Sequence, residues 1–440
     1  MLLRAIAVAT LAISAAGQTI LVKTARILDV TSGSYASNQG ILIQNGFIQQ
    51  VGAYETVRAA AARDATQLDL GNLTVLPGLI DCHSHLLMGA PEKMNGADAL
   101  ILTITKMSPM KRVLLGAKMA KEDLDSGFII VRNLGHSGID GDAALRDAIN
   151  SHWLPGPRIL ASGRKIVPEG GQAIPVQAGV LEPILKEEFL TASNPAEGRR
   201  AVLDNLRVNV DVIKVVADEG ARILDLDTMK AIVDEAHKVG VRVAVHATSR
   251  IGIEVAIDAG VDSIEHADDA TFEQFQAMQG KGIYYTPTLW PADLVVSWPD
   301  LVAVDAPPRL LSINKDAWMK QYLADQKSKI GRARKAGVKM VFGSDEWYLR
   351  SSKTRGEATL ALLAAMTQFG MTPAEAIRTA TVDAASLLEV EKYAGSIEAN
   401  KFGDLVGIDG DPLQNASDLT KVKFVMKGGR IVRDDLHGER

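Results

Sequence analysis

The chain has 440 residues, of which 47% are hydrophobic and 23% charged, the composition of a folded globular protein rather than a disordered one. Its net charge of −5 and the lack of any Lys/Arg-rich run argue against nucleic acid as a partner. The single cysteine, Cys82, excludes an internal disulfide.

The first segment, residues 1–17, has the pattern of a secretory signal peptide. Arg4 supplies a positive charge, an apolar stretch follows, and small residues at 15–17 form a cleavage site. We therefore expect a periplasmic or secreted protein; the alternative is a buried N-terminal strand or helix that is retained. No later apolar stretch is long enough to cross a membrane, so stable membrane insertion is not expected.

Two segments, 18–75 and 391–440, share a pattern of short alternating strands separated by Gly, Asn and Ser. Examples are ILVKTARILDV and GILIQNGFIQQVG in the first segment and KVKFVMKGGRIVRD in the second. The pattern suits small antiparallel sheets. We expect one β-sandwich domain assembled from both segments.

The middle of the chain, 76–390, alternates apolar β-branched runs with amphipathic helical stretches such as LDTMKAIVDEAHKVG. Strands that alternate with helices pair in parallel, and eight such units match a (β/α)₈ TIM-like barrel. An open doubly wound sheet is the second choice, although no GxGxxG motif opens the first unit. The eight candidate strands are VLPGLIDCH, FIIVRNL, RILASG, DVIKVVA, VRVAVHA, SIEHA, IYYTPTL and KMVFGSD.

Two connections, 165–192 and 290–317, are longer than a barrel requires. Both follow the carboxyl ends of strands, where barrel enzymes build their active sites. Each is expected to form either a lid or substrate wall, or a contact with a neighbouring subunit.

Six chemically active side chains share the carboxyl ends of the predicted strands. A single histidine is more often a packed core or surface residue than a ligand, but six groups at one location are hard to dismiss. Imidazole and carboxylate groups together suit zinc and similar ions. The six are His83, His85, Lys214, His246, His266 and Asp345.

Lys214 is unusual because it lies among Val and Ile in DVIKVVA. A bare ammonium there would be costly to bury. A neutral lysine can react with carbon dioxide to form an anionic carbamate that bridges two cations. Taken alone, a salt-bridged or partly exposed lysine would be the simpler interpretation, but the neighbouring candidate ligands favour the carbamate.

These motifs together resemble the amidohydrolase superfamily, over about residues 20–434. The resemblance rests on His-x-His in GLIDCHSHL, the lysine of VIKVVA, the single histidines of VAVHA and SIEHADD, the aspartate of FGSD, and the tail pattern MTPAEAIRTATVDAASLL followed by GSIEANKFGDLVGID. The spacing is most similar to the branch of bacterial Xaa-Pro dipeptidases and imidazolonepropionases. That branch includes carboxypeptidase-like enzymes and ochratoxin-hydrolysing amidases.

The resemblance implies a binuclear metal centre, with zinc as the expected metal. His83, His85 and Asp345 would hold the more buried ion, the two remaining histidines would hold the other, and carboxylated Lys214 would bridge them. Asp345 would act as general base and then general acid. The resemblance also implies a homo-oligomer.

Two departures bear on the substrate. Related deaminases carry a glutamate three residues after the histidine of the fifth strand, whereas His246 is followed by Ala247, Thr248 and Ser249, which favours hydrolysis over deamination. Related peptidases tend to have a Gly-Gly-His element after the third strand, where this chain has EGGQ at 169–172.

His136, Tyr285 and Trp290 are candidate substrate-binding residues because they follow or lie within strands at the same face. His136 is equally compatible with a solvent-facing loop, and two of the three aromatic residues Tyr284, Tyr285 and Trp290 are expected to be plain core. Arg132 is expected to form an ion pair rather than a carboxylate anchor. Cys82 is expected to be a buried inert thiol.

The sequence therefore predicts a two-metal hydrolase that cleaves an amide between an acyl group and an amino acid, in the manner of a dipeptidase or carboxypeptidase. An ochratoxin-type amide that releases phenylalanine is one candidate substrate. Hydrolysis of cyclic amides or lactones is the alternative reaction, and a metal-free binding scaffold of the same fold is the alternative of another class.

Overall fold

The computed structural model describes residues 19–92, 94, 96–170, 172, 176–219, 222–295 and 314–436. The predicted signal peptide, His437 and most of the connection 290–317 lie outside these residues. The location of the protein and the role of that connection stay predictions.

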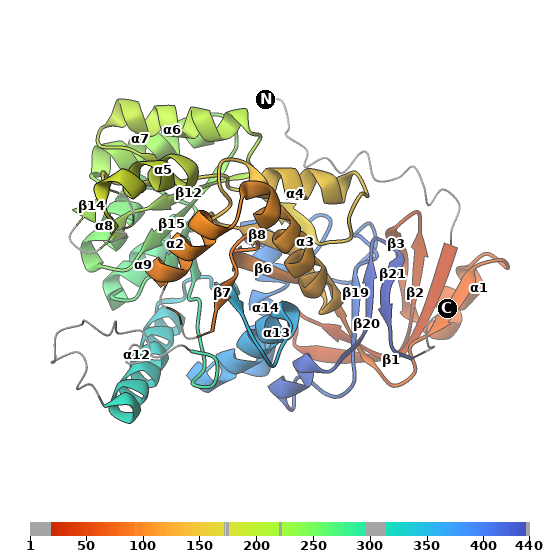
Figure 1. Ribbon diagram of the computed structural model, residues 1–440. Helices are drawn as coiled ribbons and strands as arrows, with labels where there is room; N and C mark the ends of the chain where they lie inside the picture. The colour runs from red at the N-terminus through yellow and green to blue at the C-terminus, as the bar shows by residue number, and fades with distance from the viewer. Residues whose placement is uncertain are drawn as a thin grey trace.

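Strands from both ends of the chain form one eight-stranded sheet, in which red and blue strands lie side by side (Figure 1). Its pairing is mixed rather than purely antiparallel as expected, because β1 pairs in parallel with β4 and β5. Side chains from both segments share one apolar cluster, which includes Ile41, Leu405 and Phe424. The strands are β1 (Thr19–Asp29), β2 (Ser34–Gln44), β3 (Phe47–Ala53), β4 (Thr66–Asp69), β5 (Thr74–Pro77), β19 (Leu405–Ile408), β20 (Val422–Lys427) and β21 (Arg430–Asp434).

The middle of the chain holds two sheets of parallel strands. One has the order β6-β8-β9 and the other β11-β10-β12-β15-β16-β17. Strands β6, β8 and β12 are buried along their whole length, as expected for parallel strands covered on both sides. The bounds are β6 (Leu79–Ser84), β8 (Phe128–Asn133), β9 (Arg158–Leu160), β10 (Lys165–Val167), β11 (Phe189–Thr191), β12 (Val212–Val216), β15 (Arg242–Ala247), β16 (Ser263–His266) and β17 (Tyr284–Thr286).

Backbone hydrogen bonds connect the two parallel sheets at two places. After β9, the carbonyl of Ala161 accepts from Asp211 and Val212 at 2.7 and 3.3 Å. On the other side, Tyr285 donates to Lys339 and Cys82 donates to Phe342, each at 2.9 Å. Residues 339–342 therefore lie between β17 and β6, and the hydrogen bonds continue from strand to strand around a ring.

Helices cover the outside of these strands (Figure 1), so the chain is α/β as predicted. Helix α8 begins at a Ser249 cap and ends at Gly260, and α9 begins with a Thr271–Gln274 capping box. The helices are α1 (Tyr54–Ala60), α2 (Gly96–Lys106), α3 (Pro109–Asp125), α4 (Gly141–Asn150), α5 (Ala178–Glu188), α6 (Pro195–Arg207), α7 (Leu226–His237), α8 (Arg250–Ala259), α9 (Phe272–Lys281), α12 (Lys315–Ala336), α13 (Arg355–Ala365), α14 (Pro373–Thr379) and α15 (Val382–Leu387), with short 3₁₀ turns η1 (Met366–Phe369) and η2 (Ala416–Thr420).

The connection 165–192 differs from the long loop expected. It contains β10, α5 and β11, and β10 pairs in parallel with both β11 and β12. The triplets KIV and FLT are too short to stand out as strands in the sequence. Two further short pairs lie near the strand ends: β13 (Asp218–Glu219) with β14 (Arg222–Ile223), and β7 (Ala90–Pro91) with β18 (Tyr348–Leu349).

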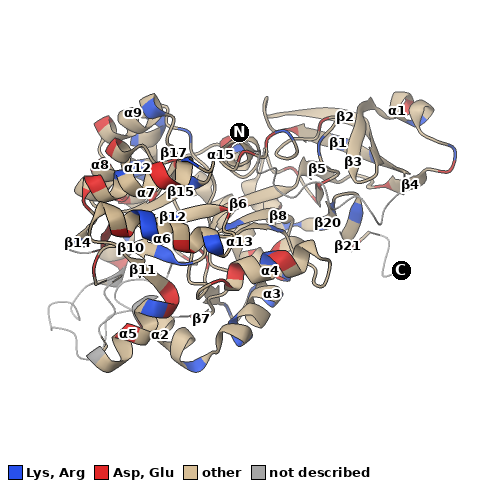
Figure 2. Ribbon diagram, turned by 90° about the horizontal axis from the view of Figure 1, so that it is seen from above, with Lys and Arg blue, Asp and Glu red and all other residues tan. Residues whose placement is uncertain are grey.

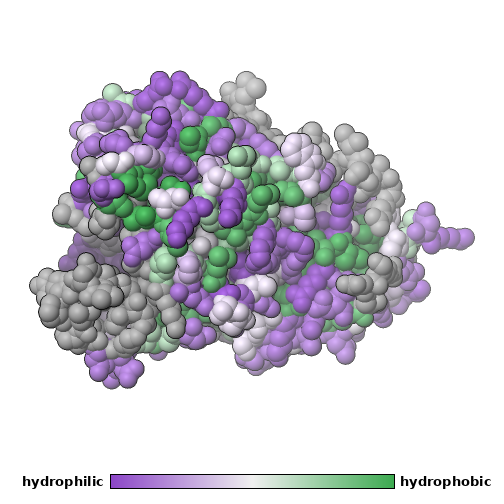
Figure 3. All heavy atoms as spheres, viewed as in Figure 1, coloured by the Kyte–Doolittle hydropathy of each residue, from purple (hydrophilic) through white to green (hydrophobic). Residues whose placement is uncertain are grey.

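The surface is mixed in both charge and polarity. Acidic and basic residues alternate over the helices (Figure 2), and apolar patches lie between polar side chains on the face seen in Figure 3. None of the helices in the described ranges combines the length and apolarity needed to cross a membrane.

Candidate metal centre

The six predicted ligands lie together. The cavity they line has a volume of about 270 Å³ and sits at the carboxyl ends of the parallel strands. His83 and His85 come from the end of β6, Lys214 from β12, His246 from β15 and His266 from β16, while Asp345 follows residues 339–342.

Asp345 lies at the centre of the cluster. Its Oδ1 atom is 3.1 Å from His85 Nε2 and 3.5 Å from His83 Nε2, and its Oδ2 atom is 3.9 Å from His266 Nδ1. Ligand atoms of His83, His266 and Asp345 all lie within 4.8 Å of one another, which suits a shared cation. The rings of His246 and His266 are 4.5 Å apart between centroids, so His246 adjoins this group.

The outer ring nitrogens of His83 and His85 are held by hydrogen bonds. His83 Nδ1 lies 2.8 Å from Glu265 Oε2, and His85 Nδ1 lies 3.2 Å from the carbonyl oxygen of Gly135. Both oxygens only accept, so each Nδ1 carries the proton. Nε2 of each ring, which lies near Asp345, is then the nitrogen that could bind a metal, as in metal-binding histidines.

Glu265 is a functional residue that sequence reasoning missed. It is fully buried, and it also accepts from Arg132 at 2.9 Å and from Ser263 at 2.6 Å. Arg132 thus forms the ion pair that was expected of it. The available signal was a glutamate in the buried strand SIEH, directly before His266.

The charges of the cluster match those of a metal site. Burial, together with nearby positive groups, lowers the pKa of His85 and brings the pKa values of His83, His246 and His266 well below the ordinary value. Burial alone would raise the pKa of Asp345, but His83, His85 and Lys214 outweigh it and hold that pKa at about 2. Neutral imidazoles and an ionised carboxylate are the forms that bind metal.

Lys214 is the feature that best fits a carboxylated bridge. Its side chain is 2% exposed, and Nζ has no hydrogen-bond partner among the described residues. Burial lowers its pKa to about 8, against the opposing charges of Glu265 and Asp345. About a tenth of this amine is therefore neutral at pH 7, compared with far less for an ordinary lysine. A buried nitrogen without a hydrogen-bond partner also gains partners once it carries a carboxylate.

Several residues around the cavity adopt left-handed backbone conformations. The φ angles are 57° at His136, 69° at His266, 45° at Thr288 and 51° at Asp345. Such conformations cost about 1 kcal/mol or more for residues other than glycine and are typical of functional sites. Thr288, which the sequence did not single out, places Oγ1 2.8 Å from His266 Nδ1.

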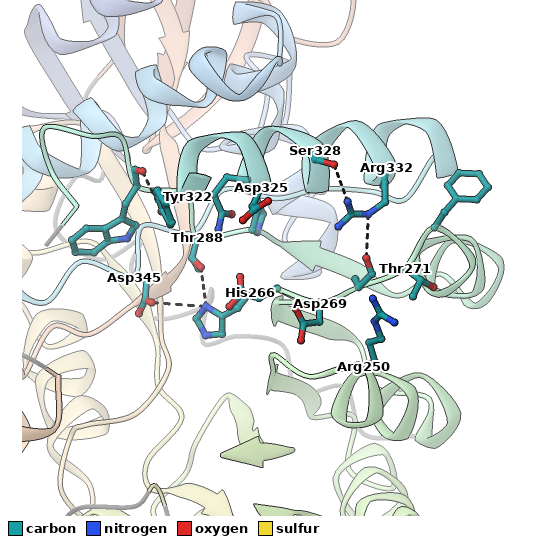
Figure 4. A pocket seen from close by; sticks show the side chains of 16 residues that line it. Arg250, His266, Asp269, Thr271, Thr288, Tyr322, Asp325, Ser328, Arg332 and Asp345 are labelled. Atoms are coloured by element: carbon teal, nitrogen blue, oxygen red, sulfur yellow. Dashed lines mark hydrogen bonds and ion pairs between the residues drawn. The ribbon is translucent and has the colours of Figure 1, made fainter. Parts of the chain in front are cut away.

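A second cavity of about 850 Å³ meets the first at His266 and Asp345. Figure 4 shows these two residues at one end and Arg250 and Arg332 at the other, with α12 along one side. Trp290 lines this cavity and donates through Nε1 to the carbonyl of Ser344 at 3.1 Å.

The other two substrate-binding candidates have different positions. His136 lines the smaller cavity, and its ring centroid is 5.0 Å from that of His85. Tyr285 is fully buried against Phe275 and donates to the carbonyl of His266 at 3.1 Å, so it supports His266 instead of facing either cavity. Cys82 is buried, and its thiol has a raised pKa because of burial, as expected of an inert residue.

Comparison with known proteins agrees with this geometry. Residues 74–432 match the amidohydrolase family. The chain is 27% identical over 432 residues to the ochratoxinase of Aspergillus niger, covering 91% of this chain and 84% of that protein. It is 28% identical to a solved Xaa-Pro dipeptidase with methionine in the active site, with a TM-score of 0.76 and coverage of 94% and 99%. The solved structure of A. niger ochratoxinase, at 23% identity, has the same fold with a TM-score of 0.77 and coverage of 95% and 96%. The resemblance predicted from the sequence is confirmed: the chain belongs to the amidohydrolase family and is a hydrolase that acts on C–N bonds.

Proposed function

We propose that this chain is a two-metal amidohydrolase that cleaves the amide bond between an acyl group and an amino acid. The observation that carries the proposal is one cavity lined by four neutral histidines, an ionised aspartate and the buried Lys214, whose Nζ has no hydrogen-bond partner in the described part of the chain. The names of the relatives, ochratoxinase and Xaa-Pro dipeptidase, support an amide or peptide bond as the target. An ochratoxin-type amide that releases phenylalanine is a candidate substrate.

The residues fit two divalent cations, with zinc as the first choice. His83, His85 and Asp345 would hold one ion, and His246 and His266 would hold the other. Reaction of the neutral Lys214 amine with carbon dioxide forms an N–C bond and releases one proton. Carboxylated Lys214 would help to hold both ions.

Bound cations would supply a nucleophilic water of lowered pKa and polarisation of the scissile carbonyl. Asp345 would accept the proton of that water and return it to the leaving nitrogen, as general base and then general acid. Its carboxylate is ionised and only 23% exposed, and it faces both cavities, so it can reach the water and the leaving group in turn.

We further propose that the parallel strands close into a (β/α)₈ barrel over 76–390. The segments 18–75 and 391–440 would form the composite β-sandwich domain. Support comes from the ring of backbone hydrogen bonds and from the shared sheet of the two terminal segments. A homo-oligomer and a periplasmic or secreted location complete the proposal.

Elemental analysis combined with a substrate panel tests the function. The purified protein should hold about two divalent ions per chain. It should also hydrolyse N-acyl amino acids or proline dipeptides in preference to lactones and cyclic amides. Activity on lactones alone would remove the peptidase assignment, and less than about one ion per chain after metal-free preparation and reloading with zinc would favour a binding scaffold.

A further inference from the structure

Lys165, on β10, ends inside the smaller cavity although it is not among the predicted ligands. Its side chain is 3% exposed. Nζ donates to His136 Nε2 at 2.8 Å and to Gln172 Oε1. The amide nitrogen of Gln172 donates in turn to Glu219 Oε2 at 3.2 Å.

The ammonium of Lys165 has no ion-pair partner within the described residues. Its two hydrogen-bond partners are an imidazole nitrogen and an amide oxygen, and neither is a carboxylate. Two nearby carboxylates have other partners: Glu188 binds Arg112 at 2.5 Å, and Glu219, which also lines the cavity, accepts from Gln172 at 3.2 Å. Burial and the nearby Lys214 lower the pKa of Lys165 to about 7, against the opposing charges of Glu188, Glu219 and Asp345. An anionic ligand would pair with this nitrogen and favour its charged form.

Part of the wall of the same cavity is apolar. Met88, Leu100, Val216 and Trp347 line it together with the candidate metal ligands. A volume of about 270 Å³, with the Lys165 amine at one end and these four apolar side chains on its wall, matches a single amino acid that has an apolar side chain and a free carboxylate. A cation in this position would contribute nothing to the binding of an uncharged amine.

We propose that Lys165 binds the α-carboxylate of the amino-acid half of the substrate and makes the enzyme selective for amides of free, apolar amino acids. The inference rests on the proposed function, because it names the substrate class for the same site. Gln172 and His136 act as positioning residues that hold the ammonium toward the cavity. The acyl half then extends into the larger cavity, which begins at His266 and Asp345.

Two substrates that differ only in the carboxylate test this proposal: N-benzoyl-L-phenylalanine and N-benzoyl-phenethylamine. The zinc-loaded wild type should prefer the first. Lys165→Met should lower kcat/KM for N-benzoyl-L-phenylalanine by about 30-fold or more, mainly through KM, and lower it far less for the phenethylamide, so that the preference for the carboxylate is lost. Lys165→Arg should retain part of the preference. Lys427→Met is the matched control, since Lys427 is a half-buried lysine of the terminal sheet that donates to Gly156 at 2.6 Å.

Binding of free L-phenylalanine, measured by calorimetry, provides a readout that needs no turnover. It should be detectable in the wild type and lost in Lys165→Met at unchanged zinc content. Equal cleavage of both substrates by the wild type, or an unchanged preference in Lys165→Met, would overturn the role of Lys165 and leave the proposed function intact. If no amide is cleaved, the proposed function fails, and the calorimetric comparison alone decides whether Lys165 binds a carboxylate.

Discussion

Replacement of Glu265 by glutamine tests whether the histidine cluster is built to bind metal. The substitution keeps the shape of the side chain and removes its charge. In the wild type the carboxylate accepts from His83, Arg132 and Ser263. In Glu265→Gln the amide oxygen can still accept from Arg132 and Ser263, but the amide nitrogen then faces His83 Nδ1.

The size of the effect follows from the tautomer of His83. Its Nε2 can bind a cation only while Nδ1 keeps the proton, and in the variant that proton faces another donor. If the ring changes tautomer, Nδ1 accepts from the amide but Nε2 gains a hydrogen and cannot bind metal. Leaving one buried donor unsatisfied costs about 1–3 kcal/mol, which is about 5- to 150-fold in zinc affinity. This agrees with the roughly 10- to 100-fold known for groups that orient metal-binding histidines.

Zinc affinity measured by chelator competition, with circular dichroism to confirm folding, is the assay. Asp404→Asn is the control, because Asp404 forms an arginine pair with Arg158 at 2.7 Å outside the histidine cluster. We expect this control to lose thermal stability at unchanged zinc affinity. A folded Glu265→Gln protein whose zinc affinity is within about twofold of wild type would refute the tautomer argument.

Three other predictions concern single side chains. Lys214→Ala should lose hydrolysis and bind less zinc, and bicarbonate should improve zinc loading of the metal-free wild type but not of the variant; full activity of the variant would rule out the bridge. His237 has a raised pKa through its hydrogen bond to Asp262. Its contribution to folding stability is therefore present below about pH 6.5 and is lost as pH rises through the higher pKa of the folded state. His237→Gln should therefore lower Tm more at about pH 5.5 than at about pH 9. The stabilising free energy that is lost should be below about 1 kcal/mol for this half-exposed pair, and an equal drop in Tm at both pH values would contradict the assignment. The buried Cys82 thiol should react with a disulfide reagent only after unfolding, and rapid labelling of the native protein would disprove its burial.

The positions of the six clustered side chains could be predicted because each lies in or directly after a predicted strand, near its carboxyl end. A buried strand is recognisable by its apolar run, and parallel strands bring their carboxyl ends to one face. His83 and His85 needed only the alternation of a strand, and His246 and His266 needed only the recognition of neighbouring strands. The whole group was therefore placed at one site without any knowledge of distances.

The residues that were missed depend on contacts between distant parts of the chain. Glu265 matters because it reaches back to His83, and Lys165 matters because β10 turns its side chain into the cavity. No local pattern encodes either contact. The prediction of a purely antiparallel terminal sheet was wrong for the same reason. The alternation within β1 gives no information on whether a neighbouring strand runs parallel or antiparallel to it.

The two cavities together imply one direction of substrate binding. The cavity of about 270 Å³, with Lys165 at one end, admits one amino acid, while the cavity of about 850 Å³ has room for a large acyl group. The two meet at His266 and Asp345, so an amide that occupied both would have its C–N bond beside the carboxylate. In that direction the leaving nitrogen stays on the Lys165 side, within reach of the proton held by Asp345. The reverse direction would bury the carboxylate away from Lys165 and force a large acyl group into the smaller space, so both charge and volume favour the same orientation.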